Sequence, residues 1–159
     1  MMKDMHNSTN RIKYGEIAPE GIAILGDLEK YIKGSGLEPK LLELVKLRAS
    51  QINGCAFCID MHTKDARSQG ESEQRLYGLS AWRETPFYSE RERAALAWTE
   101  SVTRIGEHWV LEGDMECFSK RELVDLTLAV IAINSWNRLA ISFHTPPGSY
   151  LPDHPVTKG

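Results

Sequence analysis

The chain has 159 residues, the length of one ordinary domain, with 42% hydrophobic residues, 26% charged residues and a net charge of −3. A chain of this size buries enough surface to fold without a disulfide scaffold. Its lysines and arginines are scattered, and its acidic groups outnumber them, which argues against nucleic acid or a membrane surface as a partner.

Helical patterns fill most of the chain and no segment alternates like a strand, so the sequence predicts an all-α fold. We expect a single-domain helical bundle of about six helices over residues 1–159, with a polar arm at 1–15 and a proline-rich tail at 145–159. The arm extends toward Pro19, and breaks rich in Gly, Pro and Ser separate the helices. The expected helices cover residues 19–33, 39–52, 55–69, 72–83, 89–105 and 119–143.

The starts of the last two helices carry the most specific local signals. Ser89 with Glu92, and Ser119 with Glu122, each form the pattern of a capping box. Between these two helices, residues 107–118 are expected to form a loop or a short helix.

The helix at 119–143 is apolar around much of its circumference. One face carries Leu123, Leu126, Val130 and Ile133, and a second carries Val124, Leu128, Ile131 and Leu139. A helix of this kind is buried on most sides. In a domain this small the pattern favours a subunit interface, and the alternative is a central core helix.

The sequence shows no targeting segment and no membrane span, since the longest strongly apolar run covers only residues 128–133. We therefore expect a cytoplasmic protein, whose thiols are kept reduced. There, a close pair of cysteines indicates redox or metal chemistry. The chain has three cysteines, and two of them, Cys55 and Cys58, form such a pair, whereas Cys117 has no neighbour in sequence.

Cys55, Cys58 and His62 stand at positions i, i+3 and i+7, which share one face of a helix. Because Asn53 and Gly54 break the chain just before, Cys55 should lie in the first turn, where the helix dipole stabilises a thiolate. Cysteines so placed have pKa values of about 3.5–7.5. The spacing also permits a disulfide that is easily reduced, because the turn must tighten to close it.

His62 lies one turn after Cys58, and helical side chains lean toward the N-terminus, so the imidazole can accept the thiol proton. Glu43 is the preferred partner to orient this imidazole, because a short turn joins its helix to the cysteine helix. Glu38 and Asp65 are also near in the chain. Asp60 is disfavoured, because it points off the shared face.

The stretch from Glu43 to His62 resembles the signature of the alkylhydroperoxidase D-like proteins of the carboxymuconolactone decarboxylase superfamily. In this signature a glutamate precedes the CxxC pair by twelve residues and a histidine follows it by four. Similarity to the small single-domain members extends over residues 14–140, including 85–89 and 134–138.

The resemblance implies an all-helical fold that forms homo-oligomers, trimers or hexamers, with thiol-dependent peroxidase activity and no cofactor or metal. It implies that Cys58 attacks a hydroperoxide, Cys55 resolves the product, His62 deprotonates the nucleophile and Glu43 ends the proton relay. An external thiol, dithiol or protein reductant would restore both cysteines. Phe57 stands where the namesake enzymes have a second histidine.

Three other functions stay open at this point. A zinc module could use Cys55, Cys58 and His62, but no second ligand pair is evident. A lyase or ligand-binding role exists on the same fold, in members that lack the cysteine pair. A redox-sensing switch would use the same pair with little turnover. The sequence assigns no role to Cys117 or to residues 136–138.

Overall fold

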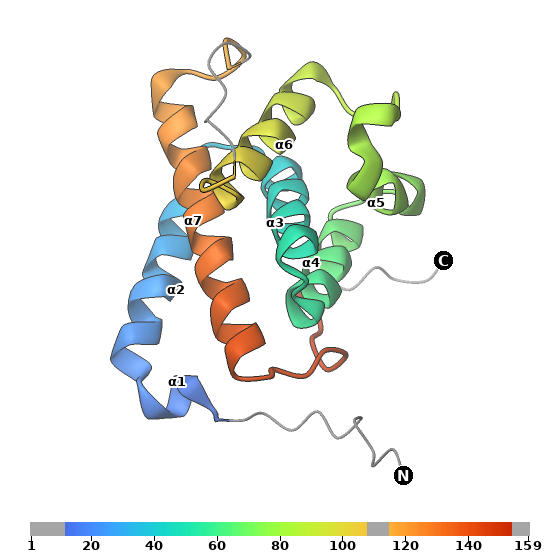
Figure 1. Cartoon of the computed structure of the whole chain (residues 1–159). Helices are drawn as coiled ribbons and strands as arrows, with labels where there is room; N and C mark the ends of the chain where they lie inside the picture. The colour runs from blue at the N-terminus through green and yellow to red at the C-terminus, as the bar shows by residue number, and fades with distance from the viewer. Residues whose placement is uncertain (1–11, 108–114, 154–159) are drawn as a thin grey trace.

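The computed structural model describes residues 12–107 and 115–153, and in these residues it is all-helical, as predicted. The described ranges hold seven α-helices, one 3₁₀ helix and no strand (Figure 1). In chain order the elements are α1 (Tyr14–Ile17), α2 (Pro19–Lys33), α3 (Pro39–Asn53), α4 (Ala56–Ser68), α5 (Glu73–Gly78), η1 (Leu79–Glu84), α6 (Glu90–Thr103) and α7 (Lys120–Ser142).

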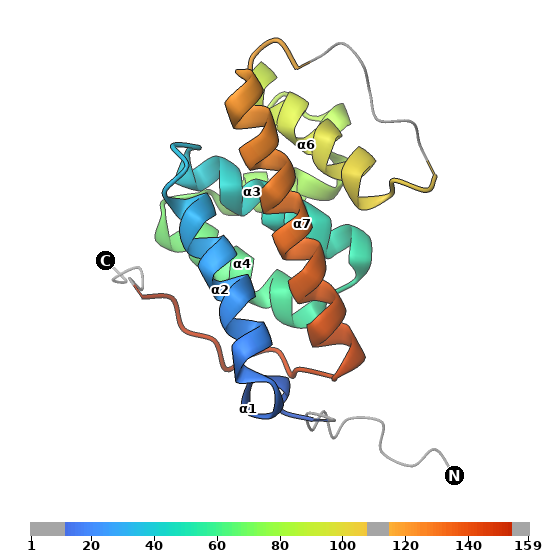
Figure 2. The same ribbon diagram turned by 90° about the vertical axis from the view of Figure 1, so that its left-hand side faces the viewer.

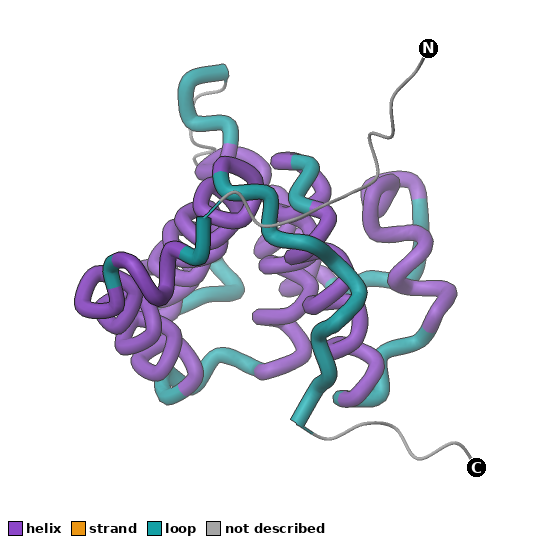
Figure 3. The backbone as a smooth tube through the Cα atoms, turned by 90° about the horizontal axis from the view of Figure 1, so that it is seen from below, coloured by secondary structure: helices purple, strands orange, loops and turns teal. Residues whose placement is uncertain are grey.

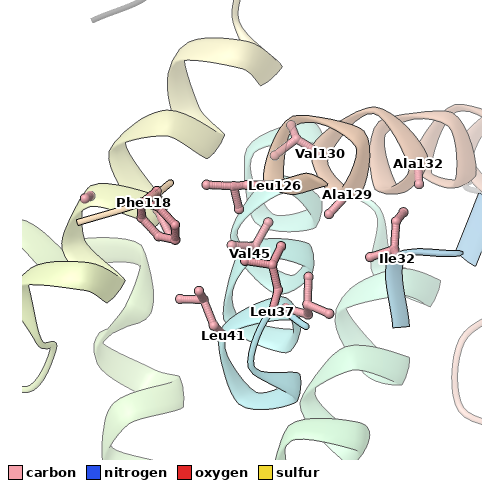
Figure 4. Close-up of a cluster of buried hydrophobic side chains, with 12 residues drawn as sticks. Ile32, Leu37, Leu41, Val45, Phe118, Leu126, Ala129, Val130 and Ala132 are labelled. Atoms are coloured by element: carbon pink, nitrogen blue, oxygen red, sulfur yellow. The ribbon is translucent and has the colours of Figure 1, made fainter. Parts of the chain in front are cut away.

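Helix α3 is the centre of the bundle and packs against α4, α6 and α7 (Figure 1). Helix α2 lies along α7 on another side of the molecule (Figure 2). In the main core cluster, Leu126 and Val130 of α7 meet Val45 of α3, with Phe118 at one end and Ile32 at the other (Figure 4). This burial fixes α3, and therefore Glu43, relative to the rest of the bundle.

The helix ends follow the local signals of the sequence. Both predicted capping boxes are present, with Ser89 before α6 and Ser119 before α7. Helix α3 ends where Gly54 takes a left-handed conformation, with φ of 70°. A residue with a Cβ is strained at that φ, so glycine makes the sharp turn into α4 possible.

The polar arm was predicted over residues 1–15, but residues 14 and 15 already belong to the short helix α1. The Tyr14 ring packs against Phe143 at the end of α7, with their centroids 5.7 Å apart. This contact joins residues far apart in sequence, so no local pattern signals it. Residues 1–11 lie outside the described part of the chain.

The single helix predicted for residues 72–83 is instead divided into α5 and η1. Within η1, Ala81 leaves the helical region, with φ of −120° and ψ of 32°. The next residue, Trp82, is buried, and its indole N–H donates to Glu100 of α6 at 2.9 Å.

The predicted loop at residues 107–118 falls mostly on residues 108–114, which are outside the described ranges. The tail is non-helical from residue 145 to 153, as its prolines require. Seen from below, this segment runs as a loop past the ends of the helices (Figure 3). It lies against α4, because Lys64 donates to the Tyr150 carbonyl at 3.0 Å and Gly148 N–H donates to Asp60 at 3.0 Å.

Helix α7 is buried on one face within the chain and open on another. Leu126, Val130 and Ile133 are buried, whereas Val124 is 57% and Ile131 is 46% exposed. The prediction that most of its circumference is buried is therefore not met by this chain alone. In the part of the chain that the structure describes, no helix is long and apolar enough to cross a membrane.

Candidate functional site

The cysteine pair lies at the turn between α3 and α4. Cys55 is the N-cap of α4, one position before the predicted first turn, because its backbone is extended, with φ of −84° and ψ of 95°. Its sulfur accepts the backbone N–H of Cys58 at 3.3 Å, and its own N–H donates to the Ser50 carbonyl at 3.0 Å. The Cys55 sulfur therefore accepts a hydrogen bond from one of the backbone N–H groups that have no partner within the first turn of a helix.

Cys55 and Cys58 are joined as a disulfide, with Cα atoms 5.3 Å apart. Each residue is only 1% exposed. The pair belongs to a small core cluster that draws on α3, α4 and α7, whose other members are Ala49, Ile133 and Ala140, with Phe57 and Trp136 packed against it. Apolar walls of this kind exclude water from the sulfur atoms.

His62 and Glu43 form the hydrogen bond that the sequence predicted. The imidazole Nδ1 lies 2.8 Å from Glu43 Oε2, and both residues are buried, at 5% and 8% exposure. A carboxylate oxygen accepts, so the imidazole donates its Nδ1 proton to Glu43, and Nε2 is the second ring nitrogen, which this contact does not use. The other candidates lie elsewhere, since Glu38 binds Arg91 and Asp60 binds Lys64, each at 2.8 Å.

Asp65, left open by the sequence, also belongs to this cluster, and Tyr150 of the tail joins it. The Tyr150 hydroxyl donates to Asp65 at 2.7 Å. Burial raises the pKa of the Asp65 carboxyl; the Tyr150 hydrogen bond acts against this rise, and the negative charge of Glu43 adds to it. Asp65 follows His62 by three residues on one helix face, whereas nothing in the tail sequence marks Tyr150.

A metal ion would find different ligands from those the sequence suggested. Ligand atoms of Glu43, His62 and Asp65 all lie within 4.8 Å of one another. The two cysteines are instead bonded to each other. Among the described residues, the zinc set of Cys55, Cys58 and His62 is therefore not assembled.

A cavity of about 330 Å³ opens beside the His62–Glu43 pair. Its charged lining is formed by Glu29, Lys33, Glu43, Lys46 and Asp65, and the buried Lys46 forms a salt bridge with Glu29 at 2.6 Å. The aromatic and apolar part of the wall is formed by Tyr14, Phe57, Met61, Trp136 and Tyr150. This part of the wall could contact the organic group of a ligand.

An amide network ties the cysteine turn to α7. Asn137 is fully buried and donates to the Ser50 hydroxyl at 3.0 Å. Asn53 donates to the side-chain oxygens of Asn137 at 2.8 Å and Asn134 at 3.0 Å. Since Ser50 also holds the Cys55 N–H, the network fixes the backbone on which Cys55 stands.

The remaining residues that the sequence left without a role are now placed. Trp136 lines the cavity, and Arg138 turns back to the Asn134 carbonyl at 2.9 Å. Cys117 is exposed and free. Among the described residues, neither Cys117 nor Arg138 lines the cavity or takes part in the His62–Glu43 hydrogen bond.

Comparison with known proteins gives a family match across the site. The model of the carboxymuconolactone decarboxylase family matches residues 19–101, which include Glu43, both paired cysteines and His62. The uncharacterized protein YdfG of Bacillus subtilis is 49% identical over 138 residues, which are 84% of this chain and 94% of that protein. The uncharacterized protein YnjA of Escherichia coli is 33% identical over 79 residues, covering 50% of this chain and 42% of YnjA.

Solved structures agree with the fold. A protein of unknown function from Agrobacterium tumefaciens, whose proposed role is that of the antioxidant defence protein AhpD, is 44% identical. It superposes with a TM-score of 0.84 over 89% of this chain and 100% of its own. The debrominase Bmp8 gives a TM-score of 0.74 over 84% of this chain and 74% of its own. At 17% identity, Bmp8 shows a shared fold only.

Proposed function

The chain belongs to the carboxymuconolactone decarboxylase family, and from this premise we propose that it is a thiol-dependent peroxidase of the alkylhydroperoxidase kind. The observation that carries the proposal is the Cys55–Cys58 disulfide at the start of α4, one turn before the buried His62–Glu43 pair. A base, its orienting carboxylate and a redox-active sulfur pair are the parts that such a reaction needs.

The proposed cycle uses two sulfur atoms and a proton relay. His62 takes the Cys58 proton, and the thiolate attacks one oxygen of a hydroperoxide, which breaks the O–O bond. The departing alkoxide is protonated to an alcohol, and Cys58 is left as a sulfenic acid. The Cys55 thiol then attacks the Cys58 sulfur, which forms the disulfide and releases water.

An external thiol completes the cycle, and a reducing cytoplasm would supply it. Two equivalents of thiol, or one dithiol, reduce the disulfide and become a disulfide themselves. The aromatic lining of the cavity beside His62 supports organic hydroperoxides as substrates over hydrogen peroxide. No step of this cycle requires a metal or an organic cofactor.

The proposal is tested by turnover of the purified protein with hydrogen peroxide, tert-butyl hydroperoxide and cumene hydroperoxide, with dithiothreitol as reductant and EDTA present. We expect thiol-dependent consumption of both organic peroxides, faster than that of hydrogen peroxide. Consumption that is no faster than with the Cys58→Ser variant would exclude the peroxidase. A disulfide that forms once, without turnover, would instead indicate a redox-sensing switch.

We also propose that the chain assembles as a trimer or hexamer, with the open face of α7 in an interface. Val124 and Ile131 are apolar, exposed and seven residues apart, so they lie on one side of that helix. Light scattering after size-exclusion chromatography should give three or six times the chain mass of 18.0 kDa. A monomer mass at micromolar concentration would contradict the assembly.

A further inference from the structure

A second, smaller cavity of about 200 Å³ borders the cysteine pair. Cys55 lines this cavity, whereas neither cysteine is among the described residues that line the larger one. Conversely, His62 and Glu43 line the larger cavity and are not among the described residues that line the smaller one. Phe57 lines both cavities.

The lining of the smaller cavity combines apolar and polar groups. Ala56, Phe57, Ala140 and Ile141 contribute apolar groups and His144 an imidazole, and none of the described lining residues is Lys, Arg, Asp or Glu. Thr145 also lines it, and its hydroxyl oxygen is buried with no hydrogen-bond partner in the part of the chain that the structure describes. A buried hydroxyl without a partner is costly, and a bound molecule would relieve that cost.

We infer that the smaller cavity is the entrance for the reductant, and that it admits a small thiol to Cys55. The inference rests on the proposed function, since it assigns the two halves of the cycle to two cavities. Peroxide would reach Cys58 from the side of His62, and thiol would reach Cys55 from the side of Thr145. The Thr145 hydroxyl would form a hydrogen bond with the incoming molecule.

The chemistry of the second half follows from this placement. The external thiolate attacks the Cys55 sulfur, which forms a mixed disulfide and breaks the Cys55–Cys58 bond. Cys58 leaves as a thiolate at the N-terminus of α4, where the helix dipole makes it a good leaving group. A second external thiolate attacks the sulfur of the first thiol, so Cys55 is released and takes up a proton, as Cys58 does.

The test measures the two halves separately, in a Cys117→Ser background that removes the exposed free thiol. For the reductive half, the disulfide is formed with diamide, a general thiol oxidant, and then treated with 2-mercaptoethanol. For the oxidative half, the reduced protein is treated with cumene hydroperoxide. Both halves are quenched by alkylation and quantified by mass spectrometry, so a failure to react with peroxide leaves the reductive half measurable.

Three variants distinguish the cavities. Ile141→Trp fills the smaller cavity and should slow reduction about ten- to a hundredfold with little effect on oxidation. Thr145→Val keeps the shape but removes the hydroxyl, and should slow reduction about three- to tenfold. Met61→Trp fills the larger cavity and should slow oxidation only. Ile24→Trp, at an exposed position of α2, is the control and should change neither half.

Two outcomes would overturn the inference. One is an Ile141→Trp protein that is reduced at the normal rate. The other is an Ile141→Trp protein whose two halves are slowed equally, which would indicate one shared entrance.

Discussion

Replacing Cys58 by serine should lower the rate of peroxide consumption at least about a thousandfold, because the attacking atom is lost. A serine hydroxyl at the same position remains protonated at neutral pH and is no substitute for a thiolate. The folded structure should be retained, since the change is nearly isosteric at a site held by the N-cap of α4. Stopped-flow measurement of peroxide loss, with circular dichroism to verify folding, checks this expectation.

Replacing Cys55 by serine should have a different effect. The first equivalent of peroxide should still react, but the sulfenic acid at Cys58 has no partner and should accumulate or form a mixed disulfide with added thiol. Trapping with dimedone and mass spectrometry detects it. Cys117→Ser is the matched control, since that thiol is exposed and free, and it should react like the unaltered protein. If both paired-cysteine variants kept normal turnover, the assigned chemistry would be wrong.

The second large effect is expected at the proton relay. His62→Ala removes the base and should lower the rate of Cys58 oxidation about a hundred- to ten-thousandfold near neutral pH. Glu43→Gln keeps the size of the side chain but removes the charge that fixes the Nδ1 proton, so a smaller loss of about ten- to a hundredfold is expected. Both rates are measured with one equivalent of peroxide, which isolates oxidation from reduction.

Coupling between these two residues tests the relay more sharply than either loss alone. If Glu43 acts only through His62, adding Glu43→Gln to His62→Ala should cause no further loss. Asp60→Asn is the matched control, because Asp60 lies on α4 like His62 but forms a salt bridge with Lys64. An additive double variant, or an equal loss in the Asp60 control, would show that Glu43 does not act through the imidazole.

Local signals carried most of the prediction of the fold. The capping boxes at Ser89 and Ser119 predicted the starts of α6 and α7. In each box the serine side chain accepts the backbone N–H of the glutamate three residues later, and the glutamate side chain accepts the backbone N–H of the serine. Gly54 gave the turn before Cys55 for an equally local reason. The contact between Glu43 and His62 could also be predicted, since a short turn forces α3 and α4 to pack as a hairpin.

What the sequence could not predict depends on contacts between distant segments. The non-helical backbone at Ala81 comes directly before Trp82, whose indole N–H donates to Glu100 on a different helix. Tyr150 reaches Asp65 from a tail whose prolines predict only the absence of helix. Asn137 supports the Cys55 turn from 82 residues away, and a buried asparagine has no periodic signature in the sequence.

The central claim is that Cys58 is ionised near neutral pH because a helix N-terminus and an oriented imidazole stabilise its thiolate. The most direct measurement is the rate of Cys58 alkylation by iodoacetamide against pH, in a reduced protein with Cys55→Ser and Cys117→Ser. A midpoint within about 3.5–7.5 is expected, moving upward when His62→Ala is added. A midpoint at or above about 8.5, unchanged by His62→Ala, would contradict the account.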